Sequence, residues 1–234
     1  MRPLCAIPAR LGSKRLAEKN IATLGGRPML AYTIDAALES ELFDAVYVST
    51  EDAGIAALAA ALGAVPHARP VALAGDLVSA TDVCLELLDA RCADGGTYDA
   101  IVCLQPSSPL RTAADVRGAW ERFVASGADF LVSVTPIDPH FFHWAVEPNG
   151  EWSRLVFGER YLVERPLLPP VYRPNGAIKI GRSGPLANLR NFFGPRLATY
   201  DMPNERSLHV AEPFDLRLAE SLFASSLASA TSRC

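Results

Sequence analysis

The chain lacks any excess of positive charge. Its 22 lysines and arginines are outnumbered by 26 aspartates and glutamates, the formal net charge is −4, and no tail carries charge of one sign. Because nucleic acids and membrane surfaces attract proteins through basic patches, we expect neither as a partner. The chain also lacks the run of about 20 apolar residues that a membrane-spanning helix needs. Its N-terminal apolar segment is short and is interrupted by Pro8 and Arg10, so we do not expect a signal peptide.

Cysteine is scarce and shows no pairing pattern. The five cysteines are odd in number and have no Cys-x-x-Cys spacing, which argues against a disulfide framework and against a zinc site. Cys5 and Cys103 fall inside apolar runs, where a reduced thiol behaves as a small core residue. We therefore expect a cytoplasmic protein with reduced cysteines.

Lysine is the scarcest charged residue, with three copies against nineteen arginines. Two of the three, Lys14 and Lys19, lie within six residues, shortly after the apolar run at residues 4–10. A buried strand that runs into a Gly12–Ser13 turn and then into several cations is typical of a loop that binds polyphosphate. The alternative is a solvated basic loop that follows an edge strand.

Short apolar runs alternate with amphipathic segments along most of the chain. Continuous apolar strands separated by helices of about 12 residues indicate parallel strands that are covered on both faces. The sequence therefore predicts an α/β fold with a doubly wound, mostly parallel sheet. Strands are expected at residues 4–9, 45–50, 100–105 and 130–135, and helices at residues 29–40, 53–62, 80–91 and 113–126 and from Pro213 onward. A strand–helix alternation is expected to resume over residues 176–180, 186–191 and 197–200.

This alternation stops after Pro136. Residues 139–172 contain two of the three tryptophans and a proline-dense stretch, so we expect an inserted subdomain within a domain formed by residues 1–138 and 173–234. Trp144, Trp152 and Phe157 would either cover a partner subunit or close the small core of the insertion itself. The sequence favours neither over the other.

Polar residues that follow the predicted strands form the candidate site, because ligands of open α/β sheets bind at the carboxyl ends of the strands. The first strand is followed by Arg10, Ser13 and Lys19, and a later strand by Gln105 and Arg111. No Gly-x-x-x-x-Gly-Lys-Ser/Thr motif is present, and no Gly-x-Gly-x-x-Gly follows the first strand. A P-loop NTPase and an ordinary dinucleotide dehydrogenase are accordingly disfavoured.

Five segments resemble, in chain order, the motifs of the CMP-sialic acid synthetases, also called acylneuraminate cytidylyltransferases. They are IPARLGSKRLAEKN, VYVSTED, ARPVALAGD, LQPSSPLR and YRPNGAIKI. The first is similar to the family's nucleotide loop, A-R-x-x-S-K-x-x-x-x-K-N, and the arginine after Lys14 is closer to the pseudaminic and legionaminic acid branches. The resemblance covers nearly the whole chain. It implies a Rossmann-like nucleotidyltransferase fold with a small inserted dimerisation subdomain, and hence a homodimer.

The resemblance implies that the chain transfers CMP from CTP to an anionic acceptor and releases pyrophosphate. The acceptor would be a nine-carbon keto-acid sugar such as a sialic, legionaminic or pseudaminic acid. Its hydroxyl would attack the α-phosphate directly, so that no covalent enzyme intermediate forms. Lys19 and Arg10 would be the catalytic cations. The nucleotide-binding residues that the family implies are Arg10, Ser13, Lys14, Asn20, Arg69 and Ser79.

Several further residues match family positions on the acceptor side, where arginines suit a carboxylate. Lys179 stands in a strand where relatives often carry tyrosine, which indicates a more anionic acceptor. His143 has aromatic neighbours, so simple packing is its alternative role. The acceptor-binding residues that we expect are Gln105, Ser108, Arg111, His143, Arg165, Arg173, Asn175 and Lys179.

The chain departs from the family near its C-terminus. The family carries Ser-x-Asp-x-Asp-x-x-x-Asp, whose first two aspartates hold the catalytic metal, and here His209 and Ala211 take their places. Mg²⁺ prefers carboxylate, water and phosphate oxygens, so we expect the triphosphate to hold it chiefly, with Asp215, Glu212 or His209 as protein ligands. Two alternatives remain open. A different anionic acceptor such as a phosphonate would supply oxygens, or the chain is an inactive nucleotide-binding relative.

Overall fold

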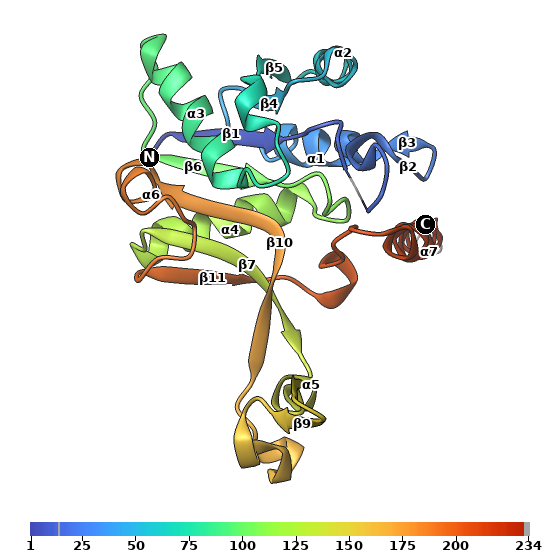
Figure 1. Cartoon of the computed structure of the whole chain (residues 1–234). Helices are drawn as coiled ribbons and strands as arrows, with labels where there is room; N and C mark the ends of the chain where they lie inside the picture. The colour runs from blue at the N-terminus through green and yellow to red at the C-terminus, as the bar shows by residue number, and fades with distance from the viewer. Residues whose placement is uncertain (14, 232–234) are drawn as a thin grey trace.

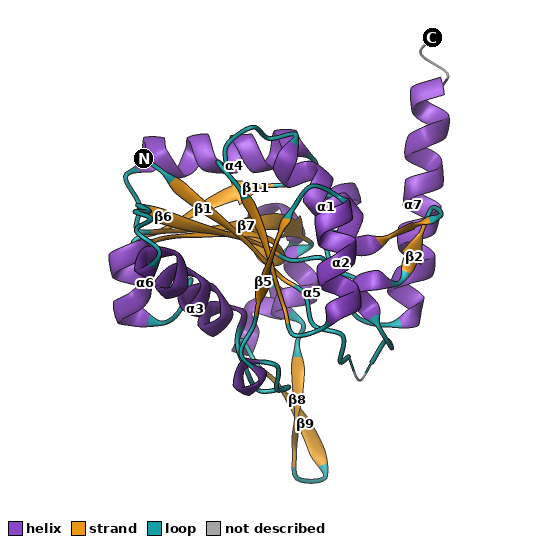
Figure 2. Cartoon of the chain, turned by 90° about the horizontal axis from the view of Figure 1, so that it is seen from above, coloured by secondary structure: helices purple, strands orange, loops and turns teal. Residues whose placement is uncertain are grey.

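The computed structural model describes residues 1–13 and 15–231, and its body is a sheet with helices on both faces (Figures 1 and 2). Within these residues the main sheet has seven strands in the order β11-β7-β10-β6-β1-β4-β5. Neighbouring strands are parallel except where β10 pairs antiparallel with β6 and β7. The strands are β1 (Pro3–Pro8), β4 (Val46–Thr50), β5 (Val65–Ala68), β6 (Ala100–Leu104), β7 (Phe130–Ile137), β10 (Val171–Arg182) and β11 (Leu197–Asp201).

Two apolar cores lie on the two faces of this sheet. Along β1, Cys5 and Ile7 contribute to one core and Leu4 and Ala6 to the other, because successive side chains of a strand point to opposite faces. Every residue of β6 is buried, since helices cover the sheet on both sides, and this explains its continuous apolar sequence. The first core is closed by α1 (Met29–Leu38), α2 (Ala53–Ala61) and α4 (Ala113–Ser126), and the second by α3 (Ala80–Ala93) and α6 (Ser183–Leu189).

A third apolar cluster attaches the last helix, α7 (Pro213–Thr231). Ala219 of this helix packs with Leu24 and Met29, next to a hairpin formed by β2 (Thr23–Leu24) and β3 (Arg27–Pro28). Figure 2 shows α7 running away from the sheet towards the C-terminus. No helix in the described part of the chain combines the length and the apolar character that crossing a bilayer requires.

The α/β architecture and the mostly parallel sheet predicted from the sequence are confirmed. The strand–helix alternation expected over residues 176–180, 186–191 and 197–200 is also present, since α6 lies between β10 and β11. Leu186 is the one buried position in this helix, which differs from the alternating burial of a strand. Pro185 lies in its first turn, where a missing N–H group costs nothing. The sequence does not predict the edge strand β5, because three of its four residues are exposed.

Residues 138–170 form an arm that projects from the sheet between β7 and β10 (Figure 1). Its hairpin of β8 and β9 is antiparallel. Trp144 stacks on His140 with ring centroids 4.4 Å apart, whereas Trp152 in the hairpin is 79% exposed. The arm thus has some packing of its own and also presents apolar side chains to solvent. Its elements are α5 (Pro139–His143), β8 (Val146–Asn149), β9 (Trp152–Leu155) and the 3-10 turns η3 (Gly158–Leu162) and η4 (Arg165–Leu167).

Candidate active site

A cavity of about 170 Å³ lies beyond the carboxyl ends of β1 and β6, at the edge of the sheet where the sequence predicts the site. We call it the strand-end cavity. Most of the residues expected to bind the nucleotide come together here, although they range in the sequence from Arg10 to Ser79. Lys14, which belongs to the same expectation, lies outside the described residues. The predicted residues that line the cavity are Arg10, Ser13, Lys19, Asn20, Arg69, Ser79 and Gln105.

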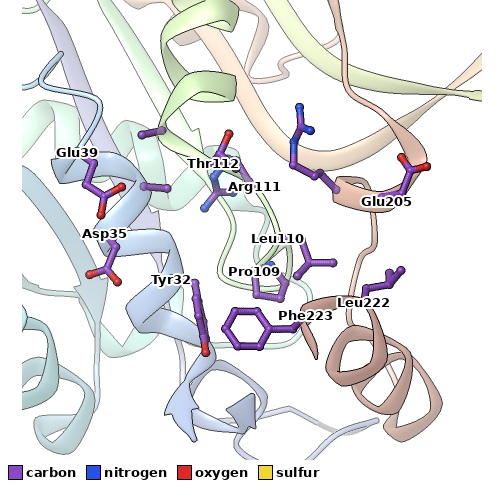
Figure 3. Close-up of a pocket in the computed structure, with 13 residues that line it drawn as sticks. Tyr32, Asp35, Glu39, Pro109, Leu110, Arg111, Thr112, Glu205, Leu222 and Phe223 are labelled. Carbon is purple, nitrogen blue, oxygen red and sulfur yellow. The ribbon is translucent and has the colours of Figure 1, made fainter. Parts of the chain in front are cut away.

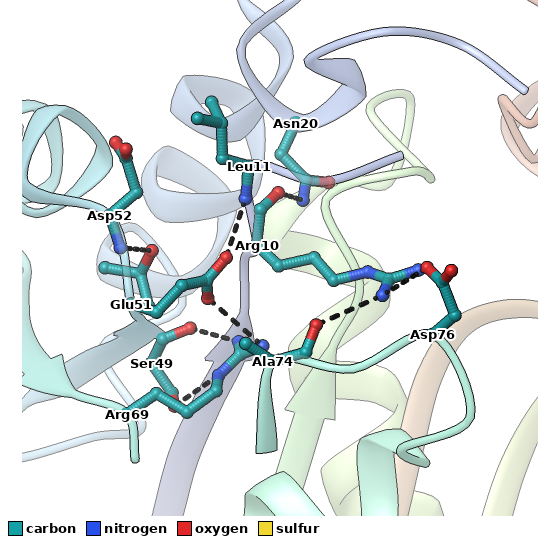
Figure 4. Close-up of polar contacts among 10 residues, drawn as sticks. Arg10, Leu11, Asn20, Ser49, Glu51, Asp52, Arg69, Ala74 and Asp76 are labelled. Carbon is teal, nitrogen blue, oxygen red and sulfur yellow. Dashed lines mark hydrogen bonds and ion pairs between the residues drawn. The ribbon is translucent and has the colours of Figure 1, made fainter. Parts of the chain in front are cut away.

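Arg10 lies at the edge of the cavity and binds the loop between β5 and α3 (Figure 4). Its Nη1 group donates to the carbonyl oxygen of Ala74 at 3.3 Å and to Oδ1 of Asp76 at 2.9 Å. Asn20, in the turn η1 (Lys19–Ile21), donates from Nδ2 to the carbonyl oxygen of Arg10 at 2.8 Å. Because the Arg10 side chain is about one-third exposed (31%), its guanidinium can exchange these partners for a bound anion.

Arg69 is buried in the cavity wall and braces its neighbours. It donates from Nε to Oγ of Ser49 at 3.3 Å and from Nη2 to the carbonyl oxygen of the same residue, and its Nη1 lies 3.6 Å from Oε2 of Glu51. Glu51 also accepts a hydrogen bond from the backbone N–H of Leu11 at 3.1 Å, as Figure 4 shows. Burial lowers the pKa of Arg69, and the charge of Glu51 opposes this effect. Arg69 therefore holds the loop of Arg10 against β4, a role that its sequence motif does not reveal.

Ser79 forms the N-cap of α3 at the cavity wall. Its Oγ accepts from the backbone N–H of Asp82 at 3.1 Å and donates to Oδ2 of Asp82 at 2.7 Å. Ser79 therefore contributes by starting α3 beside the cavity, where the N-terminal end of a helix favours negative charge.

Lys19 is a half-buried cation without an ion-pair partner among the described residues. Burial lowers its pKa, and the charges of Arg15 and Arg10 lower it further, while Asp215 opposes them. An anion that enters the cavity would remove the repulsion among these cations. Lys19 therefore gains more from a bound polyphosphate than a lysine that already has a carboxylate partner.

His209 lies next to Ser107, a residue that lines the same cavity. Its Nδ1 lies 3.3 Å from Oγ of Ser107, and the backbone N–H of Val210 donates to the carbonyl oxygen of Ser107 at 2.7 Å. A Cβ atom at Gly176 would lie 3.2 Å from Nδ1 of His209, and Gly176 has a φ of +75°. Glycine is therefore favoured there both by the backbone and by the close imidazole. Burial, followed by the charge of Lys19, lowers the pKa of His209 to about 4, so the imidazole is neutral at neutral pH.

The residues expected to hold Mg²⁺ do not form a donor set for it. Oδ2 of Asp215 accepts from the backbone N–H groups of Ala211 and Glu212, both at 2.9 Å, which caps the start of α7. Glu212 is exposed, and His209 is a neutral imidazole. In the described part of the chain no three His, Cys, Asp or Glu side chains gather as a metal site. Since Mg²⁺ prefers several oxygen ligands, these residues fit it poorly.

Three of the expected acceptor-binding residues are buried and are not among the described residues that line the strand-end cavity. Ser108 and Arg111 are buried, and Arg111 donates from Nη1 to the carbonyl oxygens of Gln105 at 3.3 Å and Ala177 at 2.7 Å. Asn175 accepts from Oγ of Ser133 and donates to Oγ of Ser207 at 2.9 Å. These bonds connect the segments that carry Gln105, Gly176 and His209.

The other acceptor-side residues lie on the arm or on β10. Arg165 is on the arm, 3.3 Å from Oδ2 of Asp138, and His143 is buried there against the ring of Phe157. Arg173 is exposed on β10, and Lys179 is half-buried on the same strand. Neither Arg165 nor His143 is among the described residues that line the strand-end cavity of this chain.

A larger cavity of about 550 Å³, which the sequence does not predict, lies between α1, the loop after Pro109 and α7 (Figure 3). Its walls include the apolar side chains of Leu110 and Phe223 and the carboxylates of Glu39 and Glu205. It is roomier than the strand-end cavity but lacks the loop cations among its described walls. A polyphosphate therefore fits the smaller cavity better.

Known proteins resemble this chain in sequence and in structure. A family model described as Cytidylyltransferase matches residues 4–142. The N-acylneuraminate cytidylyltransferase of Streptococcus agalactiae serotype V is 32% identical over 212 residues, which are 90% of this chain and 50% of that protein. This chain thus spans half the length of that relative. The CMP-N,N'-diacetyllegionaminic acid synthase of Legionella pneumophila is 33% identical over 233 residues, which cover 95% of this chain and 96% of that one.

A solved structure of CMP:2-keto-3-deoxy-manno-octonic acid synthetase complexed with CTP has a TM-score of 0.73 to this chain. The alignment covers 97% of this chain and 100% of that one at 18% identity. At this level of identity the likeness concerns the fold, and it confirms the nucleotidyltransferase-like architecture.

Proposed function

We propose that this chain, which belongs to the cytidylyltransferase family, transfers CMP from CTP to an anionic acceptor and releases pyrophosphate. The observation that supports the proposal most directly is the strand-end cavity, in which Arg10, Lys19 and Asn20 meet at the carboxyl edge of the sheet. Their loop carries the motif of the nucleotide site, and Lys19 has no carboxylate partner among the described residues.

In the reaction, the acceptor hydroxyl oxygen forms a bond to the α-phosphorus of CTP, and its O–H bond breaks with loss of the proton to solvent. The bond from that phosphorus to the oxygen bridging to the β-phosphate breaks, and the electron pair leaves with pyrophosphate. Arg10 and Lys19 would stabilise the negative charge that grows on the leaving phosphates. Arg69 and Glu51 would act indirectly, by holding the backbone of the Arg10 loop in place.

Mg²⁺ would enter with CTP and be held chiefly by the triphosphate oxygens. The chain's own residues near His209 do not make a donor set for it, as described above. The acceptor we propose is a nine-carbon keto-acid sugar of the sialic, legionaminic or pseudaminic type. Lys179 is the observation that favours an acceptor with more negative charge, such as a phosphonate, as the second candidate. The buried free thiols of Cys5, Cys84 and Cys103 suit a reducing, cytoplasmic compartment.

We also propose that the protein works as a homodimer in which the arm contacts the partner subunit. The support is the exposure of large apolar side chains on the arm, among them Phe141 at 79% and Leu167 at 76%. In such a dimer, Arg165 and His143 would lie near the neighbouring subunit's cavity.

The proposal is tested by measuring pyrophosphate release from CTP with a panel of acceptors, with and without Mg²⁺. The panel contains sialic, legionaminic and pseudaminic acids and one phosphonate, and parallel reactions replace CTP by ATP, GTP or UTP. We expect release with CTP and at least one acceptor, and none without acceptor. CTP binding in calorimetry without release from any acceptor would instead identify an inactive nucleotide-binding relative.

A further inference from the structure

Ser107 and His209 form a hydrogen-bonded pair at the wall of the strand-end cavity, although 102 positions separate them in the sequence. Oγ of Ser107 lies 3.3 Å from Nδ1 of His209, and Ser107 lines the cavity. A serine hydroxyl has one proton to donate and two lone pairs that accept. The contact with His209 is the one side-chain hydrogen bond of Ser107 among the described residues, and it uses only part of this capacity. The rest is available to a ligand in the cavity.

The backbone on both sides holds this pair together. The N–H group of Val210 donates to the carbonyl oxygen of Ser107 at 2.7 Å, so the two segments are joined next to the side-chain contact. A Cβ atom at Gly176 would lie 3.2 Å from Nδ1 of His209, which shows how closely β10 passes the imidazole. Ser207, two residues before His209, is buried and accepts a hydrogen bond from β10 through its hydroxyl. The contact between the two side chains is therefore built into the fold.

The charges of the cavity determine which way a ligand would orient this hydrogen bond. Arg10 and Lys19 line the same cavity, so the group that it attracts is an anion. A phosphate oxygen accepts hydrogen bonds and cannot donate one, so it would take the proton of the Ser107 hydroxyl. Oγ of Ser107 then accepts from the imidazole, which carries its proton on Nδ1. A hydroxyl that accepts one hydrogen bond is a stronger donor in the next, so His209 would strengthen the donor that faces the phosphate.

The position of Ser107 in the chain indicates which phosphate it would meet. Arg10 follows β1, and Ser107 follows β6, the neighbouring strand of the sheet. In the proposed reaction the leaving phosphates lie at Arg10 and Lys19, and the acceptor lies on the side of Gln105. The phosphate that is transferred has to lie between them. Ser107 stands two residues after Gln105 in the same cavity wall, which places its hydroxyl on the acceptor side of the leaving phosphates.

We propose that the hydroxyl of Ser107 donates a hydrogen bond to a non-bridging oxygen of the α-phosphate of CTP, and that His209 is the positioning residue that directs this hydroxyl. The inference rests on the proposed function and deepens it, because it assigns a donor to the group that is transferred. Negative charge spreads over the equatorial oxygens of the α-phosphate as the acceptor oxygen attacks, and a donor that is already oriented stabilises it. No covalent bond to Ser107 forms.

Two ligands that share no phosphate separate this role from a merely structural one. CMP contains the α-phosphate alone, whereas inorganic pyrophosphate corresponds to the leaving phosphates. In calorimetry with the full chain, Ser107→Ala should weaken CMP binding by about tenfold and leave pyrophosphate binding within about twofold. Arg10→Ala should show the opposite pattern. Ser126→Ala removes a hydroxyl that is hydrogen-bonded outside the cavity, and it is the matched control for both ligands.

Substitutions of His209 test the second half of the proposal. His209→Leu removes the hydrogen bond and should weaken CMP binding as Ser107→Ala does. His209→Asn places an amide nitrogen close to the position of Nδ1 and should recover most of this loss. The double variant Ser107→Ala, His209→Leu should bind CMP no more weakly than either single variant, because both remove the same interaction. Circular dichroism of each variant checks the fold.

The inference and the proposed function fail in different ways. CMP affinity that Ser107→Ala leaves unchanged, or an equal loss of affinity for CMP and pyrophosphate, would overturn the role of Ser107. His209→Asn that binds CMP no better than His209→Leu would overturn the role of His209. Either result leaves the wild-type transfer of CMP intact. A wild type that binds neither CTP nor pyrophosphate would overturn the proposed function, and the inference with it.

Discussion

Lys19 and Arg69 line the same cavity but differ in what their charges already contact. The guanidinium of Arg69 is occupied by Ser49 and Glu51, whereas Lys19 has no such partner among the described residues. The charge of Arg69 already binds groups of the protein and so holds them in place, whereas the charge of Lys19 is available to a ligand. Substitutions at these two residues should therefore have different effects.

We predict that Lys19→Ala lowers kcat/KM for CTP by about 10-fold to 100-fold, since a charge-assisted bond to phosphate contributes about 1.5–3 kcal/mol. Arg10→Ala should mainly weaken CTP binding, because it removes the guanidinium that can exchange Asp76 for a phosphate. Thermal unfolding of both variants should resemble that of the wild type. Steady-state kinetics and calorimetry provide the measurements, and Arg122→Ala serves as the control. Turnover and CTP affinity that stay within twofold of wild type in both variants would contradict the assignment of this loop.

The pH dependence of activity should report the lowered pKa of Lys19. Its ordinary value is 10.5, and burial together with Arg15 and Arg10 depresses it. Raising the pH removes the proton from Lys19 and so removes its attraction for phosphate. We predict that kcat/KM for CTP declines on the alkaline side with an apparent pKa below 10.5. The decline in kcat should lie at higher pH, because bound triphosphate stabilises the ammonium form. A profile of Lys19→Arg that keeps the same alkaline decline would contradict the assignment to Lys19.

At the scale of residues, the sequence motifs and their spacing predicted where the cavity lies, but they did not predict which side chains point into it. Arg10, Lys19, Asn20, Arg69 and Ser79 meet as the sequence predicts. The motif that supplies Gln105 to the cavity also supplies side chains that turn into a buried frame, at Ser108 and Arg111. The burial of a loop residue depends on the segments that fold over it, and a local pattern does not contain that information. Glu51 was missed for the same reason, although its place directly after β4 was a usable signal.

Among the helices and strands, α4 shows how an element that does not line the strand-end cavity supports it. Asp115 is 1% exposed, forms a capping box with Thr112 and accepts two hydrogen bonds from Arg206, at 2.9 and 2.8 Å. Arg206 belongs to the 3-10 turn η5 (Asn204–Arg206), which leads directly to the Ser207–His209 segment. The start of α4 therefore fixes the segment that carries His209. Burial alone would raise the pKa of Asp115, but the hydrogen bonds from Arg206 and Thr112 outweigh it and lower this pKa.

We predict that Asp115→Ala lowers the free energy of unfolding by about 2–4 kcal/mol, because it removes the charged hydrogen bonds with Arg206, which is 41% exposed, and the cap of α4. Urea denaturation measures this loss. Asp52→Ala, which removes only the cap of α2, is the control and should cost about 1 kcal/mol. Since the folded-state pKa of Asp115 is depressed, its contribution is present above 3.8 and is lost as the pH falls through the folded value. An equal loss in both variants at pH 7 would contradict this account.

How accurately the bounds of each strand could be predicted from the sequence depends on how deeply the strand is buried. Strands such as β6, buried on both faces, give unbroken apolar runs and were predicted within one residue of their bounds. Strand β10 was expected from Gly176, yet it begins at Val171, because its first residues pair with β7 but not with β6 and are mostly exposed. An exposed part of a strand is stabilised by its backbone pairing with a strand distant in the sequence, here β7. The pattern of apolar and polar residues does not reveal such a pairing.

At the scale of the whole molecule, the exposed apolar side chains of the arm have no explanation within a single chain. Trp152 and Phe141 are each 79% exposed, and Leu162 is 64% exposed, so the arm offers a large apolar surface to solvent. Monomeric proteins rarely expose large contiguous apolar patches, so an arm with several exposed large apolar side chains favours a partner that covers them. The arm also carries Arg165, which is 65% exposed and is not among the described residues that line its own strand-end cavity. Both observations are explained if the arm reaches the site of a second subunit.

We predict a homodimer by light scattering, and Trp152→Glu should shift it towards monomer while leaving CTP binding measurable. The decisive test mixes two variants of low activity, Lys19→Ala, which retains its arm, and Arg165→Ala, which retains its cavity. In a dimer that exchanges arms, each mixed dimer has one intact site. Because about half of the dimers in an equal mixture are mixed, activity should recover to about a quarter of wild type after subunit exchange. If each arm served its own subunit instead, the mixture would show no more activity than the sum of the two variants, and a wild-type monomer would exclude the exchange altogether.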